Sequence, residues 1–223
     1  MSTSKPRKRP KANINKPYNI GMLRTGIYAG TFDPVHAGHV AFALQALAAV
    51  KLDEVYFLPE RQPRGKQHVE HFGHRVAMLR QALKPHPQFA VLELPDVNFS
   101  IRYTLPRLQS RFDGQQLLFL FGSDVVGALP NWPLAERLVN QYELIIGVRG
   151  RDDPTIVQRT IADWSIQPKA ATLITSYAPA VSSGRVRDSL RRGQPAKGSL
   201  PSVARYSNRH WLYVQLSDSI DTA

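Results

Sequence analysis

The chain contains no cysteine, which excludes disulfides, thiolate metal sites and cysteine nucleophiles. It also lacks an apolar run of the roughly 18 residues that a membrane-spanning helix needs. Its start has no apolar segment typical of a secretory signal. We therefore expect no membrane contact and a cytoplasmic location. With 223 residues, the chain has a length typical of one domain that buries a single core.

Acidic residues are scarce, since 17 Asp and Glu face 29 Lys and Arg and the net charge is +12. Residues 1–25 carry +7 of this charge and no acid, so only +5 remains for the rest of the chain. Residues 1–21 also contain three prolines and few apolar side chains, which predicts a disordered basic arm before a folded domain of residues 22–223. Such an arm either contacts polyanions without specificity or is a solvated extension.

Beyond the arm, apolar segments of strand length alternate with segments of helical period. This alternation predicts the α/β class, as a Rossmann-like doubly wound parallel sheet with crossover helices. The predicted strands are Thr25–Ala29, Val55–Leu58, Phe89–Leu94, Gln116–Phe121, Leu144–Val148 and Leu173–Thr175. The predicted helices are Gly38–Val50, Arg75–Leu83, one from Tyr103, and Ser183–Arg191. Ligands of such sheets bind beyond the carboxyl ends of the strands, so we expect functional residues in the loops there.

The first predicted helix has apolar residues at helical spacing, which predicts one apolar face that contains Val40, Ala41, Leu44, Leu47 and Ala48.

The loop after the first predicted strand, residues 30–39, reads G-T-F-D-P-V-H-A-G-H and opens this helix. Gly30 permits a tight turn and a close approach of the backbone to a ligand. Amides at the start of a helix, here those of Thr31 and Phe32, attract anions together with the helix dipole. The loop therefore predicts a phosphate site.

His36 and His39 are three residues apart, so both rings can point to one side of the first helical turn, with Gly38 leaving room between them. Two imidazole donors then meet one phosphate. An isolated H-x-x-H pair is more often two surface or cap residues, but the phosphate-binding context favours the ligand role.

The ten-residue run resembles the signature of the HIGH-type nucleotidyltransferases, and its F-D-P-V-H-x-G-H form is similar to that of bacterial nicotinate mononucleotide adenylyltransferases. The resemblance extends over most of residues 23–214, because later segments follow that family in order and spacing. These segments are Tyr103-Thr104 with Leu108, Gly122-Ser123-Asp124, Trp132 at the family's pyridine-facing aromatic position, Ser182-Ser183 with Arg187, and an ending with Leu200-Pro201, Val203, Tyr206 and Leu212-Tyr213.

The resemblance implies adenylyl transfer from ATP to nicotinate mononucleotide, with deamido-NAD and pyrophosphate as products. It implies that His36 contacts the α-phosphate and His39 a neighbouring oxygen, while Arg187 grips the β and γ phosphates. These three are the predicted catalytic residues. Predicted ATP-binding residues are Gly30, Thr31, Phe32, Gly38, Gly122, Asp124, Ser182 and Ser183. The sequence has no evident cluster of carboxylates for a metal cage, so Mg²⁺ is expected to arrive with ATP.

Four segments depart from the family pattern. The P-P-H-K loop reads Pro63-Arg64-Gly65-Lys66, and the others are Arg102 for a serine, Arg107 for a threonine and Gly184 for a threonine. The first two departures lie near the expected acceptor site. Arg102 directly precedes a predicted helix start that favours anions. If its side chain turns inward, it adds a positive charge beside the nicotinate carboxylate, and if it turns outward, only the helix amides discriminate. We expect the nicotinate form to be preferred and Arg102 to contribute to that preference. Predicted acceptor-binding residues are Tyr103, Thr104, Trp132, Arg102, Arg64, Lys66 and Arg149.

Several of these residues also have a structural interpretation. Asp124 and Ser182 are suited to cap a following helix. Trp132 lies between Asn131 and Pro133, where a large ring is better placed for stacking than for core packing. Basic residues such as those of the loop at 64–66 are common on any basic protein.

Three other functions stay open from the sequence. One is adenylyl transfer to nicotinamide mononucleotide, and a second is another transferase of the superfamily, acting on phosphopantetheine or making a CDP-alcohol. The third, from a different class, is a basic nucleic-acid-binding module that keeps the fold without activity. The oligomeric state is also open, a homo-oligomer included.

Overall fold

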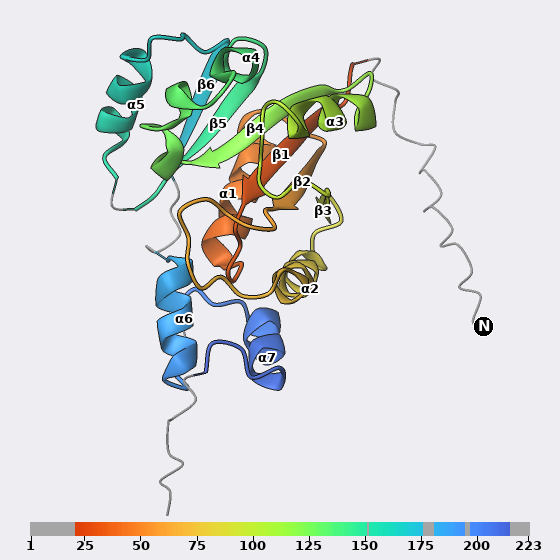
Figure 1. The fold of residues 1–223 in the computed structure, drawn as a ribbon, viewed down its shortest axis with the longest axis vertical. Helices are drawn as coiled ribbons and strands as arrows, with labels where there is room; N and C mark the ends of the chain where they lie inside the picture. The colour runs from red at the N-terminus through yellow and green to blue at the C-terminus, as the bar shows by residue number, and fades with distance from the viewer. Residues whose placement is uncertain (1–20, 151, 176–180, 195–196, 215–223) are drawn as a thin grey trace, which may run out of the picture.

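The computed structural model describes residues 21–150, 152–175, 181–194 and 197–214. Six parallel strands form one sheet in the order β3-β2-β1-β4-β5-β6 (Figure 1). The strands are β1 Arg24–Gly30, β2 Glu54–Pro59, β3 Phe89–Val91, β4 Gln116–Gly122, β5 Glu143–Val148 and β6 Ala170–Thr175. The predicted doubly wound α/β fold is confirmed. The predicted basic arm, residues 1–21, lies outside the described residues except for Gly21.

Seven α-helices connect or follow these strands within the described residues. They are α1 Ala37–Ala49, α2 Phe72–Leu83, α3 Thr104–Arg111, α4 Ala135–Val139, α5 Pro154–Ala162, α6 Ser183–Arg191 and α7 Pro201–Arg209. Two short 3-10 helices, η1 Ser123–Val125 and η2 Leu129–Asn131, follow β4. None of these helices has the length and apolar character needed to cross a bilayer. The cytoplasmic location stays a prediction.

The strand order reverses between β1 and β4. From β1 the chain passes to β2 and β3 on one side, and then returns to place β4 on the other side of β1. The loops that leave β1 and β4 therefore run in opposite directions and leave a crevice between them, where ligands of such folds bind.

The sheet is buried on both faces, and successive side chains of each strand enter different cores. In β1, Ile27 belongs to a core shared with α3, α4 and α5, whereas Tyr28 belongs to a core shared with α1, α2 and α7. The central strand β4 is correspondingly apolar at every position from Leu117 to Phe121, all of them buried.

The last two helices lie side by side at the bottom of Figure 1, with α7 also against α2. Ser182 caps α6 by accepting a hydrogen bond from the Arg185 amide (3.3 Å). Pro201 occupies the first turn of α7, where its missing N–H costs nothing. These two helices carry the chain back to the crevice.

Several predicted boundaries were wrong. The strand predicted at Phe89–Leu94 ends at Val91, because the chain diverges from β2 after Leu92 donates its amide to the Phe57 carbonyl (2.9 Å). The strand predicted at Leu173–Thr175 begins at Ala170, because β6 pairs with β5 along its whole length although its first residues are small alanines. Helices α4, α5 and α7 were not predicted.

The predicted apolar face of α1 was also partly wrong. Leu44 and Ala48 are exposed, and the buried residues are Val40, Phe42, Ala43 and Ala46. Because most positions of this helix are apolar, periodicity cannot define which side is buried. The tertiary structure decides through Phe42, whose ring lies where a Cβ of Gly147 would come within 2.9 Å.

Arg75 of α2 is fully buried and bonds to backbone carbonyls only. Its Nε donates to Glu70 O (2.9 Å), its Nη1 to Thr31 O (2.6 Å), and its Nη2 to the carbonyls of Glu60 (2.8 Å) and Arg61 (2.9 Å). One guanidinium therefore links the loops after β1 and β2 to the segment before α2.

Arg75→Met should destabilise the fold, because four carbonyls lose their donor and a buried unsatisfied carbonyl costs about 1–3 kcal/mol. We expect the free energy of unfolding to fall by about 3 kcal/mol or more in urea denaturation. Arg80→Met is the matched control, since Arg80 lies on the same helix but is exposed and only pairs with Glu93. That change should cost less than about 1 kcal/mol. Equal losses in the two variants would contradict the role assigned to Arg75.

Candidate active site

A cavity of about 960 Å³ occupies the crevice at the carboxyl ends of the strands. Its walls come from the loops after β1, β2, β4 and β5 and from the start of α6. Of the candidate residues, it collects Gly30, Thr31, Phe32, His36, Gly38, His39, Arg64, Lys66, Gly122, Asp124, Trp132, Arg149, Ser182, Ser183 and Arg187. Segments more than a hundred residues apart in sequence thus form one site.

The loop after β1 is folded over its own aromatic ring. Phe32 is 2% exposed and adopts a left-handed backbone with φ of 50°, which non-glycine residues seldom do. Its ring contacts the rings of Tyr28 (5.2 Å between centroids) and His39 (5.1 Å). A Cβ on Gly30 would come within 3.0 Å of this ring, so glycine is required there. The ring under the loop holds its backbone toward the cavity.

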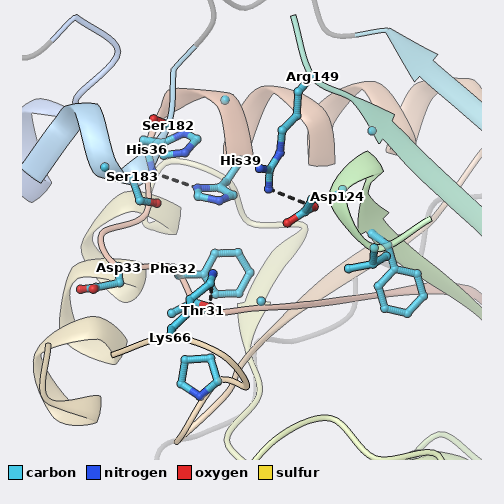
Figure 2. Close-up of a pocket in the computed structure, with 18 of the residues that line it drawn as sticks. Thr31, Phe32, Asp33, His36, His39, Lys66, Asp124, Arg149, Ser182 and Ser183 are labelled. Atoms are coloured by element: carbon cyan, nitrogen blue, oxygen red, sulfur yellow. Dashed lines mark hydrogen bonds and ion pairs between the residues drawn. The ribbon is translucent and has the colours of Figure 1, made fainter. Parts of the chain in front are cut away.

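His36 precedes α1 and His39 lies in its first turn, and their rings stack at 3.7 Å between centroids. The His36 amide donates to Nδ1 of His39 (3.2 Å), so the proton of a neutral His39 ring lies on Nε2. Nδ1 of His36 is buried and has no partner among the described residues. A Cβ on Gly38 would come within 3.1 Å of that atom. Both histidines line the cavity, and Figure 2 shows their rings beside each other.

Both histidines are neutral in the free protein. Burial, followed by the positive charge of Arg149, lowers the pKa of His36 from 6.5 to about 4. Burial also lowers the pKa of His39 well below 6.5, with further contributions from His36, Arg149 and Lys66. An anion bound at these rings would oppose the lowering, because it stabilises the charged imidazolium.

Asp33 connects the loop after β1 to α6 and to the segment that follows α7. It is 4% exposed, and its Oδ1 accepts a hydrogen bond from the Tyr213 hydroxyl (2.6 Å). Arg187 donates to the Asp33 carbonyl (2.6 Å) and lies 3.7 Å from its carboxylate. Burial, and then the charge of Asp33, raises the pKa of Tyr213, so the phenol stays protonated and donates. Ser183 completes the junction by donating to the Pro34 carbonyl (3.0 Å).

On the other side of the crevice, Asp124 pairs with Arg149 (3.0 Å), as Figure 2 shows. Both side chains are about half exposed, which leaves the carboxylate accessible to sugar hydroxyls. Gly122 leaves room for this carboxylate, because a Cβ there would come within 2.5 Å of Asp124 Oδ1 and the side chain would have to shift. Ser123 donates to Asp152 and accepts from the Arg149 amide (3.3 Å), which ties the loops after β4 and β5 together.

The loop after β2 places two cations in the cavity. Lys66 donates to Thr31 Oγ1 (2.8 Å), beside the loop after β1 (Figure 2). Arg64 instead donates to Asn98 Oδ1 (2.8 Å) and to the Phe99 carbonyl (2.7 Å). Its guanidinium carbon lies 5.9 Å from the ring centre of Trp132, which is partly buried.

Three predicted acceptor-binding residues do not line this cavity. Arg102 is exposed, and Tyr103 is 62% exposed. Thr104 is buried, but its Oγ1 accepts from the Ser100 amide (3.0 Å) at the start of α3. The structure therefore does not bring them together with Trp132.

Sequence reasoning missed several residues that shape the site. Asp33 lies inside the recognised motif, yet nothing local indicates its bond to Tyr213, 180 positions away. Arg75 resembles any helical arginine in sequence. Asn98 and Phe99, which anchor Arg64, lie just before Arg102, Tyr103 and Thr104, which were predicted to bind the acceptor.

The described residues contain no group of three or more His, Asp or Glu side chains arranged to hold a metal ion. The cavity instead presents histidines, serines, backbone amides and the cations Arg64, Lys66, Arg149 and Arg187. Such a set binds phosphate oxygens and other anions.

Comparison with known proteins agrees with this geometry. A profile of the cytidylyltransferase-like family matches residues 27–189. The chain is 33% identical over 198 residues to a probable nicotinate-nucleotide adenylyltransferase of Geobacillus kaustophilus, which covers 86% of this chain and 87% of that protein. It is 34% identical over 194 residues to a protein of the same name from Coprothermobacter proteolyticus, covering 85% and 95%.

Among solved structures, the fold is similar to that of Plasmodium falciparum nicotinic acid mononucleotide adenylyltransferase complexed with NaAD. The TM-score is 0.71 at 19% identity, over 86% of this chain and 97% of that chain. At a sequence identity of 19%, this structural similarity supports the fold alone.

The lowered pKa of His36 predicts a loss of stability in acid. Because its folded-state pKa of about 4 lies below 6.5, the unfolded chain takes up the proton first as the pH falls. The free energy of unfolding should therefore drop by about 2–3 kcal/mol from this residue between pH 7 and pH 4.5. Urea denaturation at both pH values should show a smaller drop for His36→Gln than for the wild type. Gln81→Ala, at an exposed residue of α2 that does not titrate, should keep the wild-type drop. The same drop in all three proteins would contradict the burial of a neutral His36.

Proposed function

The chain belongs to the cytidylyltransferase-like family and, within it, to the nicotinate-nucleotide adenylyltransferases, and on that premise we propose that it transfers the adenylyl group of ATP to nicotinate mononucleotide. The products are deamido-NAD and pyrophosphate. The observation that carries this proposal is a single cavity that holds a stacked pair of neutral histidines and also a tryptophan beside an arginine. The histidines suit the phosphates, and the tryptophan suits a planar ring.

The reaction is an in-line displacement. An oxygen of the mononucleotide 5′-phosphate attacks the α-phosphorus of ATP and forms the new phosphorus–oxygen bond. The bond from the α-phosphorus to the bridging oxygen of the β-phosphate breaks, and pyrophosphate leaves with that electron pair. A phosphate monoester is already an anion near neutral pH, so the step needs no general base. Catalysis then rests on positioning and on stabilisation of charge.

His36 is the proposed donor to the α-phosphate, because its ring lines the cavity, stacks on His39 and has a pKa that favours the neutral form. His39 offers its Nε2–H beside it. The amides of Thr31 and Phe32, which also line the cavity, are proposed to bind neighbouring oxygens. Neutral donors are suited to a charge that develops in the transition state, since they hold no permanent counter-ion.

Arg187, Ser182 and Ser183 are proposed to bind the β and γ phosphates at the start of α6. The bonds from Arg187 to Asp33 orient its guanidinium at the cavity wall. Asp33 and Tyr213 are thus positioning residues for this arginine. Mg²⁺ enters as part of the substrate MgATP, held by the triphosphate and water. Asp124 is proposed to accept from a ribose hydroxyl.

The reaction itself is tested by incubating the protein with ATP, Mg²⁺ and a panel of acceptors, followed by identification of the product by mass. The panel contains nicotinate mononucleotide, nicotinamide mononucleotide, phosphopantetheine and glycerol 3-phosphate. We expect deamido-NAD as the main product. A product from phosphopantetheine or glycerol 3-phosphate alone would refute the proposal.

His36→Ala should lower kcat about 10²- to 10³-fold, because loss of one donor to the developing charge typically costs that much. KM for ATP should change much less, since the ring acts mainly in the transition state. Steady-state kinetics at varied ATP separates the two constants. His86→Ala, at a histidine that does not line the cavity, serves as control and should keep most of kcat. A His36→Ala enzyme with wild-type kcat would remove His36 from the mechanism.

We also propose that residues 1–21 contact polyanions, on the basis that residues 1–25 carry +7 of the net charge of +12. Deletion of residues 1–21 should leave kcat unchanged, because the phosphate-binding run begins at Gly30. Elution from immobilised heparin should shift to lower salt. A truncated protein that folds but loses turnover would instead make the arm part of the active site.

A further inference from the structure

The far wall of the cavity from the histidines is aromatic. Trp132 meets Phe121 edge to face (5.9 Å between ring centroids, 88° between planes) and tilts against Phe99 at 6.3 Å. These rings fix the plane of Trp132 at the cavity wall. The guanidinium carbon of Arg64 lies 5.9 Å from the centre of the Trp132 ring. A planar ligand ring on this tryptophan therefore lies within reach of a cation.

Among the described residues, only one nitrogen of the Arg64 guanidinium, Nη2, has hydrogen-bond partners. Its Nη2 donates to both Asn98 Oδ1 and the Phe99 carbonyl, which uses the two hydrogens of that nitrogen. No described residue accepts from its Nε or Nη1. These atoms retain three of the five hydrogens of the fork. The backbone bond to Phe99 holds the guanidinium in place without occupying the part that would meet a ligand.

The charge of Arg64 is also not neutralised within the described residues, because none of their ion pairs includes it. The nearby carboxylates have other partners: Asp96 pairs with Arg107 (3.3 Å), and Glu60 accepts from the Phe99 amide (3.0 Å). A carboxylate is the natural partner of such a free fork.

Lys66, the second cation of the same loop, bonds to a different part of the cavity wall from Arg64. Lys66 donates to Thr31 in the loop after β1, on the phosphate side of the cavity (Figure 2). Arg64 instead bonds to the loop at residues 98–99, beside Trp132. One loop thus offers separate cations to two anionic groups of a single ligand, a phosphate and a group on the ring.

We propose that Arg64 is the specificity residue that binds the carboxylate of a nicotinate ring stacked on Trp132. The inference rests on the proposed adenylyl transfer and names the group that tells nicotinate from nicotinamide mononucleotide. It replaces the expectation that Arg102 does so, since Arg102 is exposed and outside the cavity wall. Arg64 is also one of the positions at which this chain departs from the P-P-H-K pattern of the proteins it resembles.

The test compares kcat/KM for nicotinate and nicotinamide mononucleotide at saturating ATP. In Arg64→Ala, the value for the nicotinate form should fall about 10- to 100-fold, the range expected for a lost charged hydrogen bond. The value for the nicotinamide form should stay within about threefold, since its amide carries no charge to lose. Arg64→Lys keeps the charge without the fork and should fall between Arg64→Ala and the wild type.

Arg61→Ala is the matched control. Arg61 lies in the same loop and also donates to a backbone carbonyl, that of Leu94 (3.0 Å), but it does not line the cavity. Its removal should leave the ratio of the two kcat/KM values unchanged. Arg102→Ala tests the competing assignment and should also leave the ratio unchanged.

Equal losses for both acceptors in Arg64→Ala would overturn the proposal, because Arg64 would then bind the shared phosphate or hold the loop. The proposal would also be overturned if Arg64→Ala left the ratio of kcat/KM for nicotinate to nicotinamide mononucleotide unchanged. A ratio that decreases in Arg102→Ala but not in Arg64→Ala would overturn it as well. Those results leave the proposed function intact provided that the wild type makes deamido-NAD. A wild type that uses neither acceptor would instead refute the proposed function.

Discussion

The buried guanidinium of Arg75 is the constraint on which the site depends. The loops after β1 and β2 leave adjacent parallel strands and have few backbone partners of their own, yet both line the cavity. Arg75 links the two loops, because its rigid guanidinium donates hydrogen bonds to carbonyls of both, those of Thr31, Glu60 and Arg61. The phosphate-binding run and the loop with Arg64 and Lys66 are thereby held at a defined separation.

The electrostatics of the cavity follow from an unequal distribution of burial. The two histidines are buried against aromatic rings, so desolvation keeps them neutral although they stand beside Arg149. The cations lie at the rim, where water supports their charge. In the proposed reaction, neutral donors would face the reacting phosphate, and full charges would face the groups that are anionic throughout. This division would separate stabilisation of the transition state from binding of the ground state.

Residues of the C-terminal part of the described chain complete the site beside the first strand. Tyr213 and Arg187 both bond to Asp33, so a loop that follows the first strand is held by two side chains from beyond the last one. Because the carboxylate is buried, its charge requires these donors. The described C-terminal helices thus contribute to the candidate site and to the packing of α2.

The sequence by itself determined the α/β class and, through the motif from Gly30 to His39, the family, because strand and helix periods and a contiguous motif are local properties. It did not determine which side of α1 is buried, since an almost uniformly apolar helix has no preferred side until Phe42 meets Gly147. The roles of Asp33, Arg75 and Arg64 likewise depend on contacts between distant segments, as does the exposure of Arg102 and Tyr103. Such contacts arise only when the strands pack, because neither the partner of a side chain nor its direction is encoded in its sequence neighbours.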